Sequence, residues 1–204
     1  MIGVRKMIST SNYKNCNTKF YRKIDINSDK NNIEYFSKLF PTFSYLDNVI
    51  EFKNDEEKYI YYTKLYYDNV LSALDPEEIY NELDYSILLS CEDVDDFSHR
   101  HLVAAWFDLF LEKRVNEVMI NGSHIYNIER NEDYKSLLEN IIKSEIDMKN
   151  FNSLRALYLF NKGEKFEQLA NQYNRNCSHK LIRRAYDLKQ VASETEKIYN
   201  KKRR

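Results

Sequence analysis

Side chains that can do chemistry are concentrated in residues 92–101: four carboxylates, a serine hydroxyl, two imidazoles and a guanidinium. Arg100 can clamp a phosphate or carboxylate through two hydrogen bonds, and His99 can transfer a proton or contact a ligand. The alternative is a structural Glu92–Arg100 ion pair beside a buried, hydrogen-bonded histidine. His101 is expected to be exposed.

The carboxylates of this segment have two explanations. Together with His99 they can bind a divalent metal. Acidic side chains also stabilise the N-terminus of a helix, and this is the more frequent reason for the aspartates among Glu92, Asp93, Asp95 and Asp96. We therefore expect no resident metal ion, and no motif assigns a cofactor.

The elements around the segment are predicted to place it at the edge of a sheet. An apolar run at 87–89 is too short for a helix and predicts a buried strand over residues 86–91. Ser98 is a typical N-cap residue, and apolar residues recur after it at helical spacing, which predicts a helix over residues 98–113. A strand–loop–helix join is where α/β sheets bind ligands, and backbone N–H groups there attract anions.

The order of residues in this segment has a known parallel. Ser90-Cys91-Glu92 is followed, after five residues, by Ser98-His99-Arg100 and then by residues 101–106. The pattern resembles domain-of-unknown-function family 488, whose members carry Cys-x-Glu at a strand end and Cys-His-Arg at a helix start. The resemblance covers about residues 5–120. Further similar positions are Ile8 to Tyr13, Tyr66-Tyr67, Leu71, Leu74 to Glu78 and Leu83.

The chain departs from that family at both cysteine positions, which hold Ser90 and Ser98. Cys91 lies one residue away and would point to the opposite face of a strand. The joint replacement suggests that the two positions act as a pair, and that this chain binds a ligand without the family's thiol chemistry. Ser98 would need an activating base to act as a nucleophile, and an N-cap role explains it more simply. Glu92 is the candidate general base.

The predicted fold class is α/β, with a mostly parallel, Rossmann-like sheet flanked by helices over residues 1–128. Strands are expected at residues 4–10, 20–26, 116–120 and 123–128, the last two joined as a hairpin at Asn121-Gly122. Ser9, Thr10 and Asn12 would form a second wall of the site, or only a polar turn. Helices are expected at residues 33–39 and 55–71, and a third starts where Asp75 caps Pro76.

Residues 129–204 are predicted to be a helical, basic region. Residues 151–204 hold 13 Lys or Arg against 5 Asp or Glu, a net charge of +8, and Gly163 is expected to end one helix. Residues 167–186 resemble a helix-turn-helix, although the turn lacks its usual glycine. The alternative is a helical hairpin. A DNA-binding surface would use Lys180, Arg183, Arg184 and Lys189.

Composition limits the other possibilities. A hydrophobic content of 43% is enough to build a core, and 3 Gly and 2 Pro favour long helices. No apolar run is long enough to span a bilayer, so no membrane partner is expected. Three cysteines without paired spacing and an N-terminus without a signal-peptide core predict a cytoplasmic protein.

Three possibilities remain open at this stage, two of them specific functions from different classes. The first is a cytoplasmic protein that binds the phosphate of a nucleotide or nucleic acid at Glu92, His99 and Arg100. The second is a DNA-binding protein that uses its basic C-terminal helices. A purely structural or interaction role is the third possibility.

Overall fold

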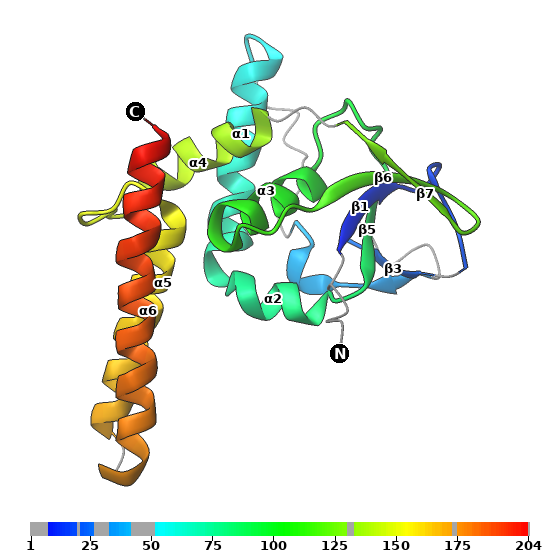
Figure 1. Cartoon of the computed structure of the whole chain (residues 1–204). Coiled ribbons are helices and arrows are strands. Elements are labelled where there is room, and N and C mark those ends of the chain that lie inside the picture. The colour runs from blue at the N-terminus through cyan, green and yellow to red at the C-terminus, as the bar shows by residue number, and fades with distance from the viewer. Residues whose placement is uncertain are drawn as a thin grey trace. The chain divides into compact units, whose positions relative to one another are not determined.

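The computed structural model describes residues 8–19, 21–26, 33–41, 52–129, 133–172 and 175–203. These residues group into two compact units, Met1–Ile142 and Lys143–Arg204, and each is described by itself. The helix α4 (Asp133–Glu145), predicted from the sequence to belong to the C-terminal region, falls mostly in the first unit. Figure 1 shows the elements of both units.

The first unit is built on the predicted parallel sheet. Its strands are β1 (Ser9–Asn12), β2 (Cys16–Asn17), β3 (Arg22–Asp25), β4 (Glu34–Tyr35), β5 (Ser86–Ser90), β6 (Asn116–Asn121) and β7 (His124–Ile128). The strand order is β2-β6-β1-β5-β3-β4, and β7 pairs with β6 in the antiparallel sense. The α/β, Rossmann-like class is therefore confirmed, and β5, predicted to be a buried strand, lies inside the sheet between β1 and β3.

The register of the strands brings distant segments to one edge of the sheet. Asn12 at the end of β1 lies beside Ser90 at the end of β5. On the other side of β1, Thr10 lies beside Glu117 of β6. Since neighbouring parallel strands end at the same edge, the polar residues that follow β1 and β5 lie close together.

The helices of this unit are α1 (Asp55–Asn69), α2 (Pro76–Glu82), α3 (His99–Leu111) and the start of α4, with short 3₁₀ turns η1 (Ser37–Leu39) and η2 (Leu71–Ala73). Asp75 caps α2 as predicted, accepting bonds from the backbone N–H groups of Glu77 and Glu78. The apolar face of α3 is buried against β1 and β5, with Trp106 and Phe107 almost completely enclosed. This packing fixes the N-terminus of α3 at the carboxyl edge of the sheet.

Two local predictions differ from the structure. The helix expected over residues 33–39 is a strand, β4, followed by the turn η1. Glu34 and Tyr35 pair with β3, and the Glu34 carboxylate binds the Arg22 guanidinium, so tertiary pairing overrides the local pattern. The first strand was expected over residues 4–10; residues 4–7 lie outside the described part, and the strand found is Ser9–Asn12.

The β6–β7 hairpin is confirmed at its predicted turn. Gly122 has a φ of 62°, a left-handed conformation that glycine adopts without strain. β7 follows from His124 to Ile128, in register with β6.

The second unit is a hairpin of two long helices, α5 (Leu154–Gln172) and α6 (Arg175–Lys202), which pack along one another (Figure 1). The prediction that Gly163 ends a helix is wrong, because α5 continues through it. A Cβ atom at Gly163 would lie 3.0 Å from the Ala185 carbonyl oxygen, so the missing side chain lets α6 approach closely. None of the described helices has both the length and the apolarity that crossing a membrane requires.

Candidate functional site

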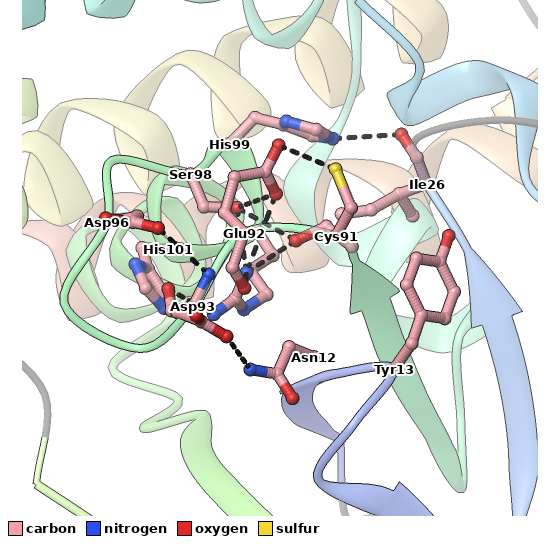
Figure 2. Close-up of polar contacts among 12 residues, drawn as sticks. Asn12, Tyr13, Ile26, Cys91, Glu92, Asp93, Asp96, Ser98, His99 and His101 are labelled. Atoms are coloured by element: carbon pink, nitrogen blue, oxygen red, sulfur yellow. Dashed lines mark hydrogen bonds and ion pairs between the residues drawn. The ribbon is translucent and has the colours of Figure 1, made fainter.

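The candidate site lies where β5 ends and α3 begins, beside the end of β1 (Figure 2). All five residues of β5 are buried, so the strand holds its carboxyl end at a fixed depth. The loop 91–97 then turns back, and Ser98 has the extended backbone of an N-cap residue. Its hydroxyl makes no capping hydrogen bond, however, so the predicted N-cap role holds for its position and not for its side chain.

Ser90 and Ser98 form a spatial pair. Their hydroxyl oxygens lie 3.0 Å apart, and both are buried. The Ser98 hydroxyl donates to Oε2 of Glu92 at 3.0 Å, so Ser90 is the donor within the pair. The two positions where the resembled family has cysteines are thus in direct contact in this fold.

Arg100 is the centre of the buried polar network. Its side chain has no exposed surface, and its Nη2 lies 3.1 Å from Oε1 of Glu117, which is also fully buried. Nη1 donates to the hydroxyls of Ser90 and Ser98 and to the Glu92 carbonyl, and Nη2 donates to the Asp93 carbonyl at 3.1 Å. The guanidinium therefore ties the end of β5 and the following loop to β6.

The expected Glu92–Arg100 ion pair is the longer of the two carboxylate contacts of Arg100, at 3.7 Å from Nη1 to Oε2. The main partner, Glu117, is absent from the sequence-based site. In the sequence Glu117 is one charged residue near the start of a strand, and only its alignment with Thr10 places it beside Arg100. Arg100 opens a largely apolar helix, and this is the sequence signal that favours a buried carboxylate partner.

Glu117 contacts His101 as well as Arg100. Burial by itself would raise the pKa of Glu117, but the hydrogen bond from His101 and the charge of Arg100 outweigh it and lower the pKa to about 2. His101 was expected to be exposed, and this is wrong: it is completely buried, with Nε2 3.4 Å from Oε2 of Glu117. Its ring also meets the ring of Tyr134 edge to face.

His99 is buried and uncharged. Its Nε2 lies 3.0 Å from the Ile26 carbonyl oxygen, which can only accept, so Nε2 carries the proton. Burial lowers the pKa of His99, against the opposing charge of Glu92. Within the described part of the chain, Nδ1 has no hydrogen-bond partner. The ring packs against Tyr66 and fixes the start of α3 beside the segment that follows β3.

Glu92 is the part of the network that reaches solvent, with 26% of its side chain exposed. Burial acts to raise its pKa, but hydrogen bonding to the Ser90–Ser98 hydroxyl pair outweighs burial and holds the pKa below the usual range. The carboxylate is therefore ionised at neutral pH. The exposed thiol of Cys91 donates to Oε1 of Glu92 at 3.4 Å. Cys91 is not part of the buried serine pair.

The residues of β1 contribute unequally to the site. Asn12 donates to Oδ1 of Asp93 at 3.0 Å, and Lys14 forms an ion pair with the same carboxylate. Thr10 lies deeper, beside Glu117, and its hydroxyl donates to the Asn116 carbonyl. Ser9 is beside Ile87 in the register, well before the carboxyl end of the strand. Of the expected second wall, the structure brings only Asn12 to the loop.

The rim of the site carries further ionisable groups. The Tyr13 hydroxyl donates to the buried Asp25 carboxylate at 2.5 Å. Among the described residues, no group of three or more histidine, cysteine or acidic side chains is arranged to hold a metal ion. Asp93, Asp95 and Asp96 are exposed in the loop, so the rim is mainly acidic, with Lys14 as the cation paired to Asp93.

The four residues of the alternative DNA surface all lie on α6. Lys180 and Arg183 are exposed. The Arg184 guanidinium lies 4.7 Å above the Phe166 ring, and Nζ of Lys189 lies 2.7 Å from a carboxylate oxygen of Glu167. Two of the four cations are therefore engaged with α5.

The chain matches no known family model, no characterised protein and no solved structure. The resemblance to family 488 therefore rests on the residues named above, and the site is argued from its own geometry.

Proposed function

We propose that the β5–α3 junction binds a phosphate group of a nucleotide or nucleic acid, in a family 488-like protein that has lost the thiol chemistry of that family. The contact between Ser90 and Ser98 carries the proposal. It supports the inference that the resembled family's two cysteines form one functional pair, and that both members were replaced together. The cysteine content further favours a cytoplasmic location.

Binding is favoured over catalysis by the state of the hydroxyls and of Glu92. Both serine hydroxyls are buried and already hydrogen-bonded within the protein. The Glu92 carboxylate, whose pKa lies below the usual range, accepts protons poorly and is a weak general base. Ser98 therefore lacks the strong activating base that a nucleophilic serine needs.

The N-terminus of α3 provides the attraction for an anion. This helix has 13 residues. The backbone N–H of His101 bonds to the Ser98 carbonyl, and those of His99 and Arg100 have no intrahelical acceptor. They lie at the carboxyl edge of the sheet, where phosphates bind in related architectures. Arg100 contributes by positioning, because its N–H groups hold the loop and are not free to clamp a ligand.

The acidic rim determines the form of the ligand. Ionised Glu92 and half-exposed Asp93 would repel a bare phosphate. Magnesium is commonly held by one or two carboxylates together with substrate phosphates, without a dedicated protein cage. We therefore expect the phosphate to bind as its Mg²⁺ complex, with the cation delivered by the ligand.

Calorimetric titration with pyrophosphate and ATP, with and without Mg²⁺, tests this proposal. We expect saturable binding with Mg²⁺, weakened about tenfold or more by Glu92→Gln, since contacts to charged groups contribute roughly 1.5–3 kcal/mol. Glu56→Gln removes an exposed carboxylate on α1 and should change nothing. Absence of binding in both buffers, or equal binding by parent and Glu92→Gln, would refute the site.

DNA binding by α6 is the second candidate. Lys180 and Arg183 are exposed near Ile182 and Tyr186, which expose 48% and 67% of their surface. Cations interleaved with an aromatic ring suit contacts to phosphates and bases.

A further inference from the structure

A cavity of about 850 Å³ lies in the first unit on the other side of the Arg100–Glu117 pair. It is bounded by α3, the start of β6, the end of β7 and the first turn of α4. His101 and Glu117 form part of its wall, so the buried network separates it from the β5–α3 junction. Its volume falls within the range of pockets for small organic ligands.

Small side chains create this space. Ala104 and Ala105 occupy the face of α3 that lines the cavity, and Val115 lies at the start of β6. Their methyl groups provide an apolar floor on which a flat molecule can lie. A larger residue at either alanine would fill part of the volume.

The cavity wall also contains an aromatic ring, that of Tyr134, which is held in a fixed position. The Tyr134 hydroxyl donates to the Asp96 carbonyl at 3.0 Å, and its ring packs against His101 and Phe97. Burial raises the pKa of Tyr134 to about 12, so the phenol stays uncharged. A ring fixed in this way can stack on a planar ligand without a large loss of side-chain entropy.

Polar groups of the wall offer donors and acceptors in balance. Two carboxamides, Asn116 and Asn127, each present a carbonyl oxygen and an NH₂ group. The charged pair Asp108–Lys135 is joined at 2.8 Å and presents both signs. Arg114 and Glu129 add one further charge of each sign. Glu117 is also in the wall, and its charge is neutralised by Arg100 behind it. The remaining charges of the wall cancel, which favours an uncharged ligand.

We propose that this cavity binds a nucleobase: a planar, uncharged heteroaromatic ring whose edge carries both hydrogen-bond donors and acceptors. Asparagine carboxamides recognise base edges through paired hydrogen bonds, and base pockets commonly combine such contacts with aromatic and apolar walls. The proposal is independent of the phosphate site, because it needs no phosphate and no Mg²⁺.

Titration of the full-length protein with unphosphorylated nucleosides, followed by calorimetry, tests the cavity. We expect saturable binding by at least one nucleoside below about 1 mM, and none by ribose. Asn127→Ala should weaken it about fivefold, the effect of one neutral hydrogen bond. The matched control is Asn17→Ala, an exposed asparagine on β2 that does not line the cavity.

Filling the cavity gives a second, independent readout. Ala105→Leu should abolish nucleoside binding while pyrophosphate binding with Mg²⁺ stays unchanged, and a thermal melt reports whether the variant is folded. If it does not fold, the Asn127→Ala titration decides alone. Failure of every nucleoside to bind, or parent-like binding by Asn127→Ala or by a folded Ala105→Leu, would overturn the proposal.

Discussion

Arg100 and Arg183 show two opposite uses of arginine in one chain. Arg100 is completely buried and bonded to Glu117, to two serine hydroxyls and to two carbonyls. Arg183 lies on α6 and is exposed. From the sequence, both are candidate contacts for an external phosphate, with a structural Glu92–Arg100 ion pair as the alternative for Arg100. The structure shows that burial decides between them, since a guanidinium saturated by the protein positions other groups, and an exposed one is available to a partner.

The largest effect is expected from replacing Arg100, the buried arginine. Arg100→Met leaves the Glu117 carboxylate buried without its main partner, which costs about 3–5 kcal/mol of unfolding free energy. Arg183→Met, on the surface, should change stability by less than about 0.5 kcal/mol. Urea denaturation measures both.

A double variant separates the ion pair from simple loss of packing. Replacing both partners, as Arg100→Met with Glu117→Leu, should recover much of the loss, because no unpaired charge remains. A loss below about 1 kcal/mol for Arg100→Met alone would show that the pair does not hold the fold together.

The next largest effect is the acid sensitivity of Glu117. Its pKa in the folded state is about 2, below the ordinary value of 4.5. The unfolded chain therefore binds the proton first, and the stabilisation is fully present above pH 4.5 and is lost as the pH falls towards 2. A shift of this size corresponds to about 3 kcal/mol.

Urea denaturation between pH 6 and pH 2 measures this dependence. Glu117→Gln should flatten the acid limb of the curve, whereas Glu56→Gln, an exposed carboxylate, should leave it as in the parent. An unchanged acid limb in Glu117→Gln would assign the acid sensitivity to other carboxylates.

The smallest expected effect concerns the exposed cations of α6. Each phosphate contact contributes about −0.9 to the slope of log affinity against log salt on duplex DNA. Lys180→Ala with Arg183→Ala should therefore reduce the slope by roughly 1.8 in gel-shift titrations of the intact chain. Arg184→Ala and Lys189→Ala should have smaller effects, because these side chains contact Phe166 and Glu167. Absence of binding by the parent at low salt would remove this function.

Much of the fold follows from local patterns. The apolar run at residues 87–89 predicted β5, Asp75 before Pro76 predicted the start of α2, and Asn121-Gly122 predicted the β6–β7 turn. Each of these signals acts within a few residues, through strand alternation, capping or backbone conformation. The same local reasoning failed at Gly163, where packing between α5 and α6 makes glycine part of a helix.

The sequence by itself determined the candidate segment, Ser90 to Arg100, and the parallel sheet that presents it. Tertiary structure decided which of its side chains are exposed and what they contact. Glu117 meets Arg100 only because β6 pairs with β1 in the register that places Glu117 beside Thr10, 107 positions earlier in the chain. Strand register depends on packing between distant segments, and no local period encodes it. For this reason His101 is buried beside Glu117, and the Arg100 guanidinium is bonded to Glu117 inside the protein instead of facing solvent.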